Sequence, residues 1–128
     1  MLAREVARDA PELVDRVVTM GTPVVGGPKY TRVGVAYRAA GYDVDEIERK
    51  IEVRHEVPIR VPVTAIYCKA DGIVDWRACI DHKTPGIEHV EVRATHFSLG
   101  FDPKVLEIVA GRLAVQPVKT VSSGRPKR

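Results

Sequence analysis

The sequence predicts an α/β fold in which a small parallel sheet is flanked by helices. Two runs rich in β-branched and apolar residues, 14–20 and 63–67, have the composition of buried strands. A third run, 87–92, alternates apolar and polar residues, as a strand with one exposed face does. Helix-like segments separate the three runs, and parallel strands require connections of that kind.

The first elements are expected to be a helix and a strand. Residues 2–9 have a helical pattern, and Pro11 ends it. The strand at 14–20 then stops at the sharp Gly-Thr-Pro break of residues 21–23. The predicted apolar stripe of the helix consists of Leu2, Val6 and Ala10.

Residues 30–56 are more polar and helix-like, without a strand pattern. Asp43 and Asp45 are candidate N-caps for a helix over residues 46–53. This helical segment between two strands is longer than a simple crossover connection. We therefore expect a helical insert at this point of the sheet.

The second half of the chain is expected to alternate helices and strands. A short helix over residues 76–81 follows the second strand, with Asp75 as its cap. The third strand, 87–92, is expected at a sheet edge. Asp102 caps a last helix that has Pro103 at its first position. The predicted core stripe of this helix consists of Val105, Leu106, Val109 and Leu113.

Composition and charge exclude several classes of protein. A chain of 128 residues with 45% apolar and 29% charged residues is typical of one soluble globular domain. No run approaches the ~20 apolar residues of a membrane span, and the N-terminus lacks a signal-peptide pattern, so we expect a cytoplasmic protein.

The formal net charge of +3 owes much to the basic tail at residues 116–128, which is expected to be disordered. The rest of the chain lacks the basic face with interleaved aromatics that binds nucleic acid. A solvated tail is therefore favoured over a phosphate-binding arm.

The cysteines and histidines show no metal-ligand or redox spacing. Cys68 ends an apolar strand and is expected to be a small buried residue, whereas Cys79 is expected on the following helix. His82 and His89 are expected at the surface.

Asp71 and His96 are the candidate catalytic residues. Each lies a few residues after a predicted strand, and functional groups of parallel sheets collect at the carboxyl ends of the strands. An aspartate that accepts the Nδ1 proton of an imidazole leaves the other ring nitrogen for a nucleophile. Either residue alone has a structural explanation, as a turn aspartate or a structural histidine, but the pair favours chemistry.

With these residues identified, the chain resembles the C-terminal half of an α/β-hydrolase of the esterase/lipase type. Residues 7–23 resemble the helix after the nucleophile, the next strand and its Gly-Thr-Pro turn, and residues 28–58 resemble the helical lid. Residues 62–76 resemble the strand and loop of the catalytic acid, and His96 falls in the loop of the base. The resemblance covers residues 1–115 and implies a partial α/β-hydrolase fold: three parallel strands with flanking helices and a helical lid insert.

The resemblance implies hydrolysis of a carboxylic ester or related acyl bond in a small-molecule substrate. His96 would be the base and Asp71 the acid that orients it, and no metal or organic cofactor is implied. Asp75 is a rival for the acid role, although its position suits a helix cap better.

The chain departs from the family in its nucleophile, because it contains no Gly-x-Ser-x-Gly motif. Thr22 follows a strand, but its turn explains it more simply, and Ser98 is on the wrong loop. The remaining serines, both in the tail, are Ser122 and Ser123.

The resemblance places the nucleophile and the oxyanion hole before Met1. We therefore expect a truncated fragment that is inactive on its own. One half of a split hydrolase and a non-catalytic α/β interaction module are the alternatives. The strand at 14–20 would lack a neighbour, so self-association through this sheet edge is expected.

Overall fold

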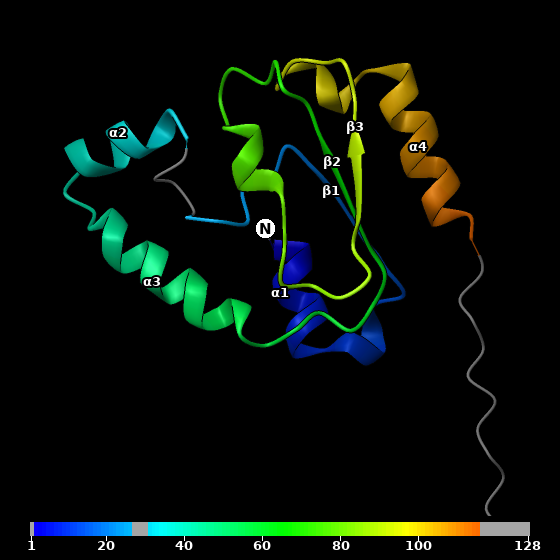
Figure 1. The fold of residues 1–128 in the computed structure, drawn as a ribbon, viewed down its shortest axis with the longest axis horizontal. Helices are drawn as coiled ribbons and strands as arrows, with labels where there is room; N and C mark the ends of the chain where they lie inside the picture. Colours follow the sequence, from blue (N-terminus) through cyan, green and yellow to red (C-terminus); the bar gives the residue numbers. More distant parts are fainter. Residues whose placement is uncertain (1, 27–30, 116–128) are drawn as a thin grey trace, which may run out of the picture.

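The computed structural model describes residues 2–26 and 31–115, which form an α/β fold around three parallel strands (Figure 1). The strands are β1 (Val17–Met20), β2 (Val63–Tyr67) and β3 (Glu88–Glu91). They pair in the order β1-β2-β3. The parallel sheet predicted from the sequence is therefore confirmed, with β3 at an edge. The predicted disordered tail lies outside the described residues.

The described residues form four α-helices, two of which pack on the sheet. α1 and α4 pack on its opposite faces, whereas α2 and α3 form an arm to one side of it (Figure 1). The α-helices are α1 (Leu2–Asp9), α2 (Val33–Ala39), α3 (Val44–His55) and α4 (Pro103–Leu113). The short 3-10 helices are η1 (Pro11–Leu13), η3 (Trp76–Cys79) and η4 (Ser98–Gly100).

β2 is the central strand and is buried on both faces, as its continuous apolar pattern predicts. On one face Ile66 belongs to a core cluster with Val105 of α4. On the other face Val63 clusters with Ala7 of α1 and with Ile59. Because successive side chains of a strand point to opposite sides, one apolar strand serves both layers.

Several predicted boundaries are corrected by the structure. β1 begins at Val17 rather than at residue 14. η1 ends at Leu13, and the Val17 amide bonds Pro62 O (2.9 Å), directly before β2. β3 loses one residue at each end relative to the prediction. The helix after β2 is a single 3-10 turn that ends at Cys79.

Aspartates cap the helices largely as predicted. The Asp43 carboxylate accepts hydrogen bonds from the amides of Asp45 and Glu46, both at 3.0 Å, so α3 begins at Val44. Asp45 therefore lies in the first turn of α3 and is not a second cap. Asp102 caps α4 by accepting hydrogen bonds from the amides of Lys104 and Val105, and Pro103 is the first residue of the helix.

The apolar stripe predicted for α1 is wrong. Leu2 is 79% exposed and Val6 is 41% exposed. The buried face of the helix consists instead of Arg4, Ala7 and Arg8. The reason is electrostatic: Asp81, from a distant segment, pairs with Arg4, whereas Arg8 pairs with Glu5 of the same helix and donates to Val57 O, so both arginines can be buried.

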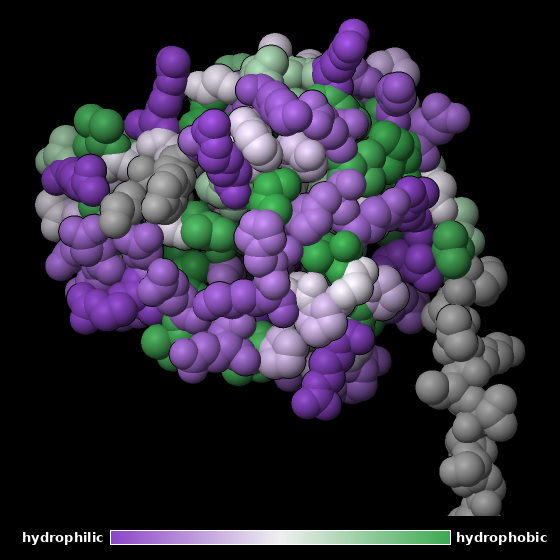
Figure 2. Space-filling model, viewed as in Figure 1, coloured by the Kyte–Doolittle hydropathy of each residue, from purple (hydrophilic) through white to green (hydrophobic). Residues whose placement is uncertain are grey.

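The stripe predicted for α4 is partly wrong. Val105 is fully buried, and Ile108 and Val109 pack against the same core cluster. Leu106 and Leu113, however, are exposed. On the face shown in Figure 2, hydrophobic side chains are scattered among hydrophilic ones, so that face presents no continuous apolar surface.

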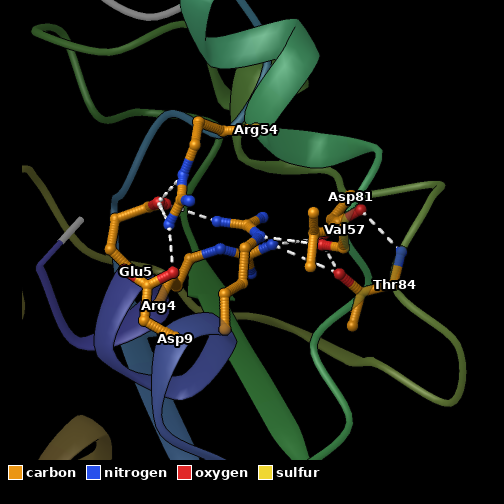
Figure 3. Close-up of polar contacts among 8 residues, drawn as sticks. Arg4, Glu5, Asp9, Arg54, Val57, Asp81 and Thr84 are labelled. Atoms are coloured by element: carbon orange, nitrogen blue, oxygen red, sulfur yellow. Dashed lines mark hydrogen bonds and ion pairs between the residues drawn. The ribbon is translucent and has the colours of Figure 1, made fainter.

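A buried ion pair joins α1 to the loop after η3 (Figure 3). Arg4 pairs with the carboxylate of Asp81, and its Nη2 lies 3.3 Å from the Thr84 hydroxyl. Burial alone would raise the pKa of Asp81. Hydrogen bonds from Thr84, Lys83 and Arg4 outweigh burial and hold that pKa well below its usual range.

A second set of contacts ties α1 to the end of α3 (Figure 3). Arg54 donates to Glu5 (2.9 Å) and to Asp9 (2.8 Å). Arg8 pairs with Glu5 and donates through Nε to Val57 O (3.0 Å). The helical arm is therefore fastened to the body of the domain by charged groups of α1.

His55, the last residue of α3, is half-buried beside these guanidinium groups. Burial, and then the positive charges of Arg8 and Arg4, lower the pKa of His55. Asp81 and Glu5 oppose that shift but do not cancel it. The folded state therefore resists protonation of this imidazole more than the unfolded chain does.

We expect the free energy of unfolding to fall as the pH is lowered from 7.5 to 5.5. In that window the unfolded chain takes up a proton at His55, near pH ~6.5, before the folded state does. Urea denaturation at both pH values measures the loss. His55→Gln should reduce it, whereas His82→Gln, at an exposed position, should not. An equal loss in the wild type and in His55→Gln would contradict the assignment.

Candidate active site

The candidate site lies where the three parallel strands end. Gly21 directly follows β1, Asp71 is in the loop after β2, and His96 is in the loop after β3. The Gly21 amide donates to Ile66 O of β2 (2.9 Å), and the His96 amide donates to Asp71 O (3.2 Å). The sheet topology thus brings together three residues that are far apart in the sequence.

The side chains of Asp71 and His96 contact each other directly. His96 Nδ1 lies 2.8 Å from Asp71 Oδ2, within hydrogen-bond reach. The carboxylate side chain is 3% exposed, whereas the imidazole is 34% exposed. Among the residues that the structure describes, none forms a hydrogen bond with His96 Nε2. The buried carboxylate therefore orients the ring and leaves its second nitrogen accessible.

Asp71 is held in place by its own loop. Its Oδ1 accepts hydrogen bonds from the amides of Ile73 (3.0 Å) and Val74 (2.7 Å), which is the geometry of an aspartate turn. The turn uses Oδ1, and His96 uses Oδ2. The turn and the contact with His96 therefore use different oxygens of the carboxylate.

Cys68 is buried next to the pair. Its Sγ lies 3.8 Å from Asp71 Oδ2. Burial, and then the Asp71 carboxylate, raise the pKa of the Cys68 thiol to about 11. Burial is also the main reason why the pKa of Cys79 rises to about 12. Both thiols therefore stay protonated at neutral pH and are poor nucleophiles.

Gly21 lies so close to Asp71 and His96 that a side chain at its position would crowd them. A Cβ at this position would lie 2.9 Å from Leu99 Cδ1, 3.1 Å from Asp71 Oδ2 and 3.2 Å from His96 Nδ1. Its φ of +55° also favours glycine. The sequence marks residues 21–23 as a turn, but nothing in it indicates that the turn touches Asp71 and His96.

We expect Gly21→Ala to separate Asp71 from His96, because the added methyl group would occupy space beside both contacting atoms. The left-handed backbone should add about 1–2 kcal/mol of instability. Gly86→Ala is the matched control, since Gly86 has a φ of +67° with nothing within 4 Å of its Cβ position. The downfield NMR signal of the hydrogen-bonded Nδ1 proton should vanish in Gly21→Ala only. Its survival there would contradict the prediction.

The other sequence candidates have structural partners instead. Asp75 accepts from the Arg77 amide (2.9 Å) and caps η3. The Ser98 hydroxyl is engaged with Thr95, accepting from its amide at 2.8 Å. The Thr22 hydroxyl lies 3.4 Å from Met20 O. None of the three is hydrogen-bonded to His96 within the described part of the chain. Ser122 and Ser123 lie outside it.

The prediction of a surface position is wrong for His89. This residue is half-buried, and its Nε2 accepts a hydrogen bond from the Asp81 amide (3.0 Å). His82 is exposed, as predicted. Across residues 2–26 and 31–115, no group of three His, Cys, Asp or Glu residues could hold a metal ion. No helix in the same ranges is both long and apolar enough to cross a membrane.

Comparisons of the chain with protein-family models, with curated proteins and with solved structures find no match. The structure shows a small α/β domain with a three-stranded parallel sheet and identifies no family.

Proposed function

We propose that Asp71 and His96 are the acid and base of a serine-hydrolase relay that cleaves a carboxylic ester or related acyl bond. The observation that carries the proposal is the 2.8 Å contact of a buried carboxylate with Nδ1 of a partly exposed imidazole. In such a relay the imidazole takes the proton of an attacking hydroxyl through Nε2 and returns it to the leaving group. The aspartate keeps the ring in the required tautomer.

The order of the elements supports the proposal. The acid follows one strand and the base follows the next, which is the chain order of acid and histidine in α/β-hydrolases. α2 and α3 fall within residues 28–58, the segment that resembles the helical lid of that family. The chain would thus be the C-terminal part of such a fold.

The relay requires a serine from outside the described residues, because no described serine is hydrogen-bonded to His96. β1 pairs with β2 alone in the described sheet, so its outer edge is open to a further strand. Gly21, at the carboxyl end of β1, lies beside both Asp71 and His96. A parallel strand added to this edge would therefore end close to His96, where a nucleophile is needed.

The test starts from the coding DNA directly upstream of the Met1 codon. We expect an in-frame Gly-x-Ser-x-Gly motif there, and hydrolysis of p-nitrophenyl acetate by the extended chain but not by the 128 residues alone. His96→Ala should abolish this activity, whereas His82→Ala, at an exposed position, should preserve it. An extended chain without activity, or one whose activity survives His96→Ala, would contradict the proposal.

An α/β interaction module without chemistry is the second candidate, and exposed apolar side chains near β1 favour it. Leu2, Leu13 and Met20 are exposed, and β1 is an edge strand. This candidate implies that the 128-residue chain self-associates in gel filtration. A monomer that unfolds cooperatively would contradict it.

A further inference from the structure

A shallow cavity of about 610 Å³, wide open to solvent, lies beside the loop that carries Asp71. Its walls are residues 31–32, Lys69 and residues 72–77. The Arg32 amide donates to Ile73 O (3.0 Å), and Thr31 forms an antiparallel bridge with Val74, so the first wall is joined to the Asp71 loop. The volume lies within the range of small-molecule sites.

The cavity is rich in positive charge. Among the described residues, three cationic ones, Arg32, Lys69 and Arg77, line it together with a single carboxylate, that of Asp75. Lys69 has an exposed ion pair with Glu91 (2.9 Å), and Arg77 approaches Asp75 only to 3.4 Å. Arg32 forms no side-chain hydrogen bond or ion pair with any residue that the structure describes. With respect to the described residues, its guanidinium therefore has all its donors available for a ligand.

Trp76 contacts two of the cationic side chains, those of Lys69 and Arg77. Its ring stacks on Tyr67 with centroids 5.9 Å apart. Lys69 Nζ lies 5.3 Å and Arg77 Cζ lies 5.1 Å from the centre of the indole ring. Cation–π contacts of this kind restrain long side chains before a ligand arrives, which lowers the entropic cost of binding.

We propose that this cavity binds the negatively charged group of a small organic oxyanion, a carboxylate or a phosphate ester. Arg32 would form charge-assisted hydrogen bonds with the oxyanion, and Lys69 and Arg77 would neutralise it. Because Gly72 and Ile73 directly follow Asp71, the bound anion would lie next to the acid loop. The binding of this anion does not depend on the proposed function, and only its assignment to the substrate of the relay would rest on that function.

Trp76 is the single tryptophan of the chain, so its fluorescence reports on this cavity. The 128-residue chain is titrated with benzoate, with phenyl phosphate and with neutral benzyl alcohol at constant ionic strength. We expect saturable quenching by one or both anions, weakened by added sodium chloride, and none by benzyl alcohol. The anion that binds with the higher affinity shows whether the cavity prefers a carboxylate or a phosphate ester.

Arg32→Gln should weaken anion binding about fivefold or more, without loss of an internal contact. Arg49→Gln, at an exposed position of α3, is the matched control and should leave affinity unchanged. Equal quenching by benzyl alcohol, no saturable quenching, or equal affinity in the two variants would overturn the proposal. Because binding is measured without turnover, an inactive extended chain would contradict the relay and leave the anion site standing.

Discussion

Asp71→Asn is expected to lower kcat/KM of the extended chain for an activated ester by about 10⁴-fold. The reason lies in the two carboxylate oxygens. Oδ1 accepts from the amides of Ile73 and Val74, so the carbonyl oxygen of an asparagine would stay there. Its NH₂ group would then face His96 Nδ1 and place the imidazole proton on Nε2. In that tautomer the ring cannot take a proton from the nucleophile.

Asp75→Asn is the control for this substitution, because Asp75 is a nearby carboxylate whose described contacts are with Arg77. Its effect should stay within about threefold. The tautomer of His96 can also be measured by ¹⁵N NMR in the 128-residue chain, without a nucleophile. Comparable rate losses from the two substitutions, or an unchanged tautomer in Asp71→Asn, would contradict the assignment of Asp71.

The sheet and the Asp71–His96 contact were accessible to sequence reasoning because both follow from local patterns and topology. The apolar run of β2 predicts a strand buried on both faces, and parallel neighbours bring their carboxyl ends together. Gly21 was not accessible as part of the site. Its turn is visible in the sequence, but the closeness of its Cβ position to two side chains from other loops is a tertiary contact.

The buried face of α1 could not be predicted from the sequence either. A helical pattern assigns apolar residues to the core, and on that rule Leu2 and Val6 should be buried and Arg4 exposed. The rule fails because the partner of Arg4 is Asp81, 77 residues away, where no local pattern can indicate it. Once the pair forms, the stem of Arg4 packs as an apolar chain and its charge is neutralised.

Asp81→Asn is expected to lower the free energy of unfolding by about 3–5 kcal/mol. Arg4 is 1% exposed, and its Nε and Nη1 already lack hydrogen-bond partners among the described residues. Asparagine preserves the oxygen that accepts from the amides of Lys83 and Thr84, but it sets an NH₂ donor against the guanidinium. The substitution therefore removes the charge of Asp81 together with the oxygen that accepts from Arg4 and from the Thr84 hydroxyl. A loss of this size is a large part of the ~5–15 kcal/mol typical of a whole domain.

Two further variants separate this effect from a general loss of charge, each measured by urea denaturation. Glu46→Gln removes the exposed pair with Lys50 and should cost less than about 0.5 kcal/mol. Adding Arg4→Met to Asp81→Asn should restore part of the stability, because no buried charge is then left without a partner. A loss in Asp81→Asn no greater than that in Glu46→Gln would contradict the prediction.

The same ion pair predicts how stability depends on acid. The folded state holds the pKa of Asp81 below its ordinary value, so the stabilisation is complete above that value and is lost as the pH falls below about 4. The wild type should therefore lose more stability than Asp81→Asn between pH 5 and pH 3. Parallel losses in the two proteins would show that the acid sensitivity resides in other carboxylates, and that Arg4 does not depend on the charge of Asp81.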